Sequence, residues 1–81
     1  GEVFRRALLD EAAGLVLFHN HPSGDLEPSR DDLELTRRLV EGGRMLSVQV
    51  LDHVIVAASR WLSLRVTRPE IFAQRAAIPS G

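Results

Sequence analysis

The sequence predicts a small α/β domain, a sheet of few strands flanked by helices. Two apolar runs of strand-forming residues, at 13–18 and 47–58, are separated by an amphipathic segment that begins after Ser29. The resulting order of helix, strand, helix and strand is typical of α/β proteins. The chain has 81 residues, which is enough for one small domain.

Composition narrows the classes of function. The net charge is −1, and the ten basic residues are all Arg and are scattered, so we expect no direct nucleic-acid binding. The absence of cysteine excludes disulfides and thiolate metal sites, so imidazole and carboxylate groups would have to hold any metal. The sequence shows no signal peptide and no long apolar run, and we expect a cytoplasmic protein without a membrane partner.

The first segments predict a helix and then a strand. Residues 2–10 place apolar side chains at helical spacing, which predicts a short amphipathic helix with a face of Val3, Phe4, Ala7 and Leu8. Residues 13–18 form a continuous apolar run that is too short for a helix of its own. We therefore expect a buried strand that leads directly into His19 and His21.

A turn-rich loop and a second helix follow. Pro22, Ser23, Gly24 and Asp25 break the strand, and turn chemistry is sufficient to explain Gly24. Ser29 reads as a helix N-cap with a carboxylate three residues later. The helix should bury a stripe of Leu33, Thr36, Leu39 and Val40, and the pair Gly42-Gly43 should weaken its end.

The last third of the chain predicts further strands and a short helix. Residues 47–58 are apolar on both faces and should form a buried strand, whereas residues 61–66 are a weaker candidate, suited to an edge. Pro69 can open a helix that runs to about Gln74, and residues 78–81 should fray. Because so thin a sheet rarely stands alone, we expect a larger protein or a homo-oligomer formed through an exposed sheet edge.

Three side chains predict a metal site. His19 and His21 lie two residues apart at the end of a strand, so both imidazoles point to the same side. Asp32 lies in the first turn of the next helix, where the loop can bring it back over the strand end. Two imidazoles and one carboxylate suit Zn²⁺ and leave a fourth position for water, the arrangement of a catalytic zinc site.

Simpler interpretations stand beside this one. A His-x-His pair at a strand end is by itself a weak signal, and a helix cap accounts for Ser29 and Asp32 without any catalysis. The Ser29 hydroxyl could also donate to an oxyanion, and the two roles do not exclude each other. His53 is better explained as a packed or supporting residue than as a ligand.

The joint spacing adds a resemblance to these signals. The pattern is His-x-His, seven residues, Ser, two residues and Asp, and it resembles the JAMM signature of the JAB/MPN metalloprotease superfamily. The stretches 19–25 and 27–32 are similar to its RadC branch in particular, as are residues 2–8, 35–39, 51–56 and 63–65. The resemblance implies a partial JAB/MPN-like (cytidine-deaminase-like) sheet flanked by helices, with the N-terminal strands missing. Residues 1–81 would then be the C-terminal part of a single such domain.

The resemblance also implies roles. His19, His21 and Asp32 would hold Zn²⁺, and Ser29 would stabilise the tetrahedral intermediate during cleavage of a peptide or isopeptide bond. The general base of the family is a Glu well upstream of the His-x-His strand, and Glu2 matches a helix position rather than that base. A non-catalytic MPN-type interaction or scaffold module is the alternative. A nucleic-acid-binding repair factor ranks last, because only the family's DNA-repair label supports it.

Overall fold

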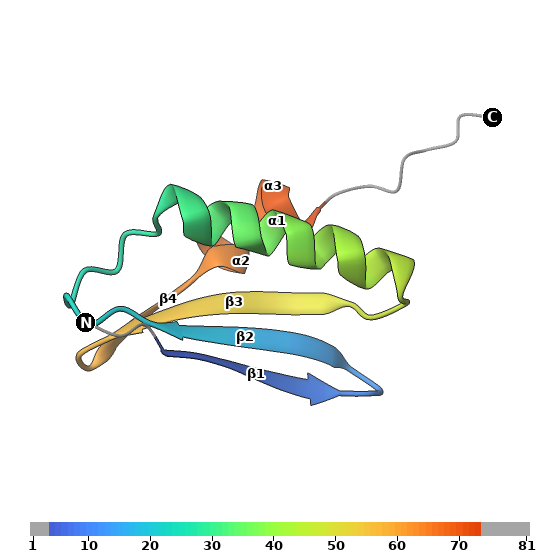
Figure 1. Cartoon of the computed structure of the whole chain (residues 1–81), viewed down its shortest axis with the longest axis horizontal. Coiled ribbons are helices and arrows are strands. Elements are labelled where there is room, and N and C mark those ends of the chain that lie inside the picture. Colours follow the sequence, from blue (N-terminus) through green and yellow to red (C-terminus); the bar gives the residue numbers. More distant parts are fainter. Residues whose placement is uncertain (1–3, 74–81) are drawn as a thin grey trace.

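One mixed sheet with all helices on one of its faces makes up the fold (Figure 1). The computed structural model describes residues 4–73. The strands are β1 (Phe4–Asp10), β2 (Gly14–Asn20), β3 (Val50–Ala57) and β4 (Arg60–Ser63). The helices are α1 (Arg30–Met45), α2 (Leu64–Thr67) and α3 (Pro69–Phe72). The predicted α/β class is confirmed, and the mixed four-stranded sheet is consistent with a partial JAB-like domain.

The sheet has the order β1-β2-β3-β4, so neighbours in sequence are also neighbours in space. The first two strands and the last two strands form antiparallel hairpins. Strands β2 and β3 are parallel, and α1 makes the crossover between them. This topology brings the end of β2 close to the start of the crossover helix, which is the position of the predicted metal ligands.

The prediction of a helix over residues 2–10 is wrong, because Phe4–Asp10 is strand β1. Its seven residues pair with β2 in an unbroken antiparallel register from Phe4↔Asn20 to Asp10↔Gly14. The Asp10 carboxylate accepts hydrogen bonds from the backbone N–H groups of Ala12 and Ala13, which closes the hairpin turn. Pairing with a buried strand outweighs the weak helical spacing of a seven-residue segment.

Helix α1 begins as predicted at an N-cap Ser29, with a complete capping box. It continues past the glycine pair, which was expected to weaken its end, and reaches Met45. At Gly43 the backbone of the following segment comes close, since the Val48 N–H donates to the Gly43 carbonyl at 2.7 Å. A Cβ at Gly43 would lie 2.4 Å from the Val48 carbonyl oxygen, so glycine permits this tight return to β3.

The end of the chain was predicted only in part. The strand expected at residues 61–66 ends at Ser63, and residues 64–67 form helix α2 instead. The Ser63 hydroxyl caps this helix by accepting from the Val66 N–H, which ends the strand. Pro69 opens α3 as expected, and that helix ends at Phe72. The predicted extension to Gln74 and the predicted frayed tail lie outside the described residues.

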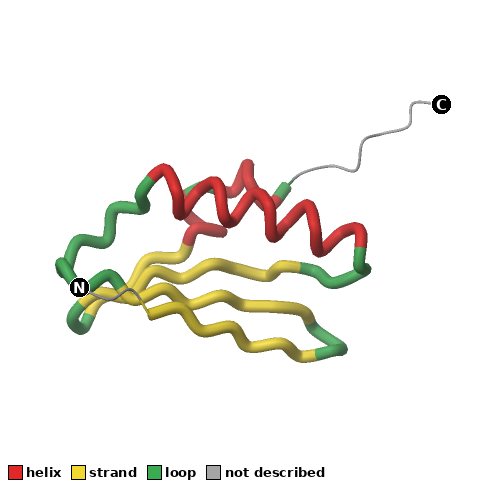
Figure 2. Tube along the Cα trace, viewed as in Figure 1, coloured by secondary structure: helices red, strands yellow, loops and turns green. Residues whose placement is uncertain are grey.

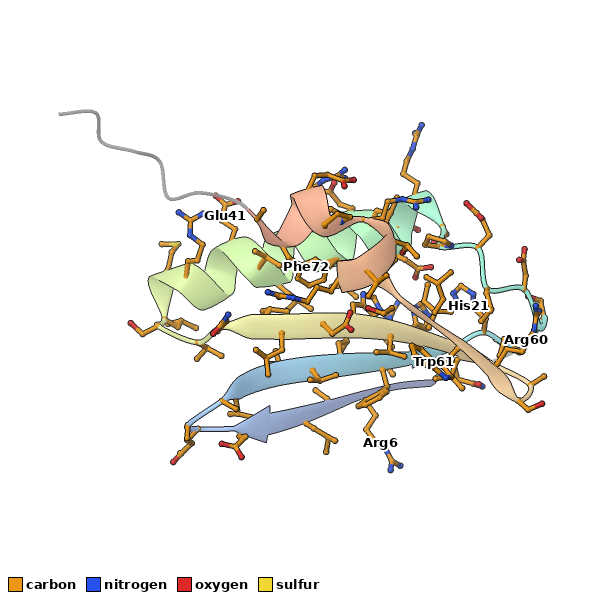
Figure 3. The ribbon with its side chains drawn as sticks, turned by 180° about the vertical axis from the view of Figure 1, so that it is seen from behind. Arg6, His21, Glu41, Arg60, Trp61 and Phe72 are labelled. Carbon is orange, nitrogen blue, oxygen red and sulfur yellow. The ribbon has the colours of Figure 1, made fainter. Side chains whose placement is uncertain are left out.

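The core lies between the helices and one face of the sheet (Figure 2). Val40 of α1, Val50 of β3 and Ile71 of α3 form its buried centre. No described helix covers the opposite face, where Trp61 is 68% exposed and Arg6 points away from the helices (Figure 3). No helix among the described residues is long and apolar enough to cross a membrane.

Candidate metal centre

Two imidazoles stand at the carboxyl end of β2. His19 belongs to the strand and is buried with 3% exposure, while His21 follows the strand with 14% of its side chain exposed. Their rings meet edge to face, with centroids 4.7 Å apart. The alternation of the strand thus places both on the helix side, as the spacing predicted.

Asp32 completes the group from the first turn of α1. Its side chain is 2% exposed, and its two oxygens face different imidazoles. Oδ1 lies 2.8 Å from His19 Nδ1, and Oδ2 lies 3.0 Å from His21 Nε2. One ligand atom from each of the three residues falls within 4.8 Å of the others, so the fold brings the predicted set together.

The capping box holds the Asp32 carboxylate in place. Oδ2 accepts a hydrogen bond from the Ser29 N–H at 2.8 Å, and the Ser29 hydroxyl accepts from the Asp32 N–H at 3.0 Å. Burial alone would raise the pKa of Asp32, but the Ser29 hydrogen bonds and the two imidazoles outweigh it and hold that pKa below its usual value. The carboxylate is therefore charged at neutral pH.

The tautomer of His21 follows from its second contact. Nδ1 lies 2.8 Å from the Asp25 carbonyl oxygen, which can only accept, so Nδ1 carries the proton. In the neutral ring Nε2 then presents a lone pair toward the Asp32 carboxylate. Two acceptors that face each other at 3.0 Å require a proton or a cation between them. Fixing a ligand imidazole through its other nitrogen is common at metal sites.

His19 leads to the same conclusion by another route. Its Nδ1 is close to Asp32 Oδ1, but the alignment is not that of a hydrogen bond, so this buried nitrogen has no such partner among residues 4–73. Burial lowers the pKa of His19, although Asp32 opposes the shift, so the ring is neutral and can offer a lone pair.

The donor set fits zinc. Ligand atoms at about 2.0 to 2.1 Å from a tetrahedral zinc lie roughly 3.3 Å apart, and the two nitrogen–oxygen distances of 2.8 and 3.0 Å need only small outward shifts to reach that value. Two neutral imidazoles and one carboxylate are the ligands of known catalytic zinc sites, and they leave a fourth position open.

The loop between the ligands is tied to the rest of the fold. Gly24 has a φ of +86°, in the left-handed region that glycine adopts without strain, so the turn needs a residue of this type. Arg60 is the first residue of β4, and its guanidinium donates to the Gly24 carbonyl at 3.0 Å. His21 and Arg60 both lie at the right of Figure 3. A hollow bordered by His21, Pro22, Ser23, Asp25 and Glu27 opens beside the group.

His53 lies behind the site and outside the ligand group, as expected for a packed residue. It is fully buried, and burial lowers its pKa to about 4, so the ring is neutral at pH 7. Its contact with Thr36 Oγ1, at 2.6 Å, is the feature that sequence reasoning missed. Thr36 was assigned only to the buried stripe of α1, and the one available signal was a hydroxyl among apolar positions.

Comparison with known proteins places this geometry in a family context. The protein-family model called RadC-like JAB domain matches residues 1–69 of this sequence. Curated relatives called UPF0758 protein are 53% identical in Methanococcoides burtonii, 50% identical in Clostridium perfringens and 53% identical in Caldanaerobacter subterraneus subsp. tengcongensis, each over 64 residues. These alignments cover 79% of this chain and 28% of each relative, so the chain spans just over a quarter of their length.

Proposed function

The chain belongs to the RadC-like JAB domain family, and we propose that it carries the zinc-binding part of a hydrolase site that cleaves a peptide or isopeptide bond. His19, His21 and Asp32 would hold the metal. The observation that carries the proposal is the convergence of the neutral His19 imidazole, the His21 imidazole and the charged Asp32 carboxylate at the end of β2.

The residues of the chain divide the work. Zinc, when bound, would lower the pKa of a coordinated water to about 7 and so supply hydroxide at neutral pH. Asp32 offers a charged oxygen whose position the Ser29 N–H fixes. The backbone carbonyl of Asp25 orients His21 by accepting a hydrogen bond from its Nδ1, so that Nε2 keeps its lone pair.

Ser29 supplies a donor for the reacting carbonyl group. Its oxygen accepts from the Asp32 N–H, whereas its own hydroxyl proton has no acceptor within residues 4–73. Ser29 is exposed, so a substrate could reach its hydroxyl. Donating this proton to a developing oxyanion would contribute about 3 kcal/mol to transition-state stabilisation. We assign the general base to a Glu in the remainder of a longer protein, as the family resemblance implies.

A non-catalytic interaction module is the second candidate. The helix-free face of the sheet favours it, because Leu8 is 58% exposed and Trp61 is 68% exposed there. An interaction module of this kind does not require side chains arranged to bind a metal, so metal binding distinguishes the two candidates.

Zinc binding by matched variants tests the proposal. We expect about one Zn²⁺ per chain, measured by elemental analysis and by competition with a chromophoric chelator. His21→Ala and Asp32→Ala each remove one of the three ligands and should lower the affinity by orders of magnitude. Asp31→Ala is the control, because Asp31 is an exposed carboxylate in the same helical turn that lies outside the ligand group.

The metal-bound protein would then be assayed for hydrolysis of peptide and isopeptide bonds. Activity that depends on zinc and is lost in Asp32→Ala supports the hydrolase. Zinc binding that survives both ligand substitutions would eliminate this site, and a metal-free protein that binds another protein through its bare sheet face would favour the interaction module.

A further inference from the structure

Two polar side chains are fully buried beside the candidate metal centre and take no part in the ligand group. Thr36 lies one turn after Asp32 on α1, and His53 lies on β3 below it. Both have 0% exposure. Burying two polar groups in a domain this small has a cost, so their hydrogen bonds need to be accounted for.

Counting hydrogens fixes the direction of these bonds. Thr36 Oγ1 lies 2.7 Å from the Asp32 carbonyl oxygen and 2.6 Å from His53 Nδ1. The carbonyl can only accept and the hydroxyl has one proton, so Thr36 donates to Asp32. His53 must then donate its Nδ1 proton to Thr36. Its Nε2 is left with a lone pair and has no hydrogen-bond partner in the described part of the chain.

The ring of His53 also lies against a proposed ligand. It stacks on the His19 imidazole, with centroids 5.7 Å apart and planes 16° from parallel. The parallel register pairs Leu17 with His53 and His19 with Ile55, so the two imidazoles are diagonal neighbours on the same face of the sheet. His53 therefore contacts the backbone of one ligand through Thr36 and the ring of another directly.

The uneven use of the two nitrogens argues against a purely structural role. An unpaired buried acceptor destabilises the folded protein, and an apolar side chain of similar shape would avoid that cost. Among residues 4–73, the only hydrogen bond of the His53 ring is the one to Thr36. That bond links α1, which carries Asp32, to β3. Strand β3 pairs with β2, and β2 carries His19.

We propose that Thr36 and His53 form a positioning pair that holds Asp32 and His19 in the arrangement that binds metal. The proposal rests on the proposed metal site. Supporting groups behind metal ligands change affinity by about ten- to a hundredfold when they are removed, and this pair should do the same.

Four variants test the pair. Thr36→Val keeps the shape but removes the hydroxyl, and His53→Phe keeps the ring but removes the donor. Thr36→Ser restores the hydroxyl. The matched control is Val40→Ala, a buried position one turn further along α1 that belongs to the apolar cluster with Val50 and Ile71 and carries no polar side-chain group. Each protein is measured for Zn²⁺ affinity, for the absorption spectrum with Co²⁺ and for the melting temperature without metal.

We expect Thr36→Val and His53→Phe to bind Zn²⁺ about ten- to a hundredfold more weakly and to shift the Co²⁺ spectrum. Thr36→Ser should bind close to wild type, and Val40→Ala should melt earlier with its affinity retained. Histidine ¹⁵N NMR of the metal-free wild type should show His53 protonated at Nδ1 and bare at Nε2, and this readout needs no variant to fold.

Four outcomes would overturn the inference. Wild-type affinity and spectrum in Thr36→Val would leave the metal site standing without the pair. An equal loss in Val40→Ala would show that general destabilisation causes the effect, and a proton on His53 Nε2 would refute the direction of the bonds. If the wild type itself bound no zinc, the proposed function would fail and this inference would fail with it.

Discussion

The adjacent glycines of α1 should respond to the same substitution with opposite signs. Alanine is better than glycine in a helix interior by about 1 kcal/mol, so both positions share this favourable contribution. A Cβ at Gly42 meets nothing within 4 Å. Gly42→Ala should therefore stabilise the protein by about 1 kcal/mol and raise its melting temperature by about 4 to 8 °C.

At Gly43 the favourable contribution is opposed by a collision. The added Cβ would lie 2.4 Å from the Val48 carbonyl oxygen and 3.3 Å from Val50 Cγ2. The nearer atom is backbone in the connection to β3, and it cannot move aside as a flexible side chain would. Overpacking typically costs about 1 to 3 kcal/mol, and a contact this short belongs at the upper end, so Gly43→Ala should lose about 2 kcal/mol net.

Thermal and urea unfolding of the two single variants and the double variant would measure these changes. The single effects should not add strictly, because neighbouring residues share the last turns of one helix. If Gly43→Ala stabilised the protein as much as Gly42→Ala, the close approach of the chain after α1 would be wrong. The position of β3 relative to that helix would then be in doubt as well.

Two further substitutions test the local contacts of the site and of the sheet edge. Ser29→Ala should cost about 1 kcal/mol of stability through loss of the cap, and should lower the turnover of any substrate that the wild type accepts by about a hundredfold. Ser29→Thr should keep both the stability and the turnover. Unchanged turnover in Ser29→Ala would show that Ser29 acts only as a helix cap. Asp52→Ala should cost about 3 kcal/mol in urea unfolding, because the Asp52 carboxylate accepts from Ser63 Oγ and from the N–H groups of His53 and Arg65. Asp52→Asn, which keeps one acceptor oxygen, should lose less, and a loss below 1 kcal/mol in both variants would show that these bonds contribute little to stability.

Local signals explain which parts of the fold could be predicted. The apolar run before His19 is bounded by turn residues, and Ser29 with Asp32 forms a capping box, so β2 and the start of α1 were evident from a few adjacent positions. The candidate ligand group of His19, His21 and Asp32 followed from them, because a short loop joins the strand end to the first turn of the next helix. Family resemblance then added the zinc chemistry.

The remaining parts depend on contacts between distant residues. Phe4–Asp10 is a strand because β2 is available to pair with it, and the apolar spacing of the segment alone favours a helix. Residues 64–67 turn into a helix at the Ser63 cap, whereas their composition favours a strand. Thr36 and His53 are seventeen positions apart on different elements, so no local pattern links the hydroxyl to the imidazole.

The parallel pairing of β2 with β3 bears on how the protein reaches its native state. Both hairpins close over short turns, but β2 and β3 can meet only after the chain of residues 21–49 has folded across. Such long-range pairing is intrinsically slow, because the entropy of loop closure is lost before the new contacts form. His19 lies on β2 and His53 on β3, and Asp32 lies on α1, the helix that connects these two strands. A metal ion that recognises only the completed arrangement should therefore slow unfolding and leave the rate of refolding almost unchanged.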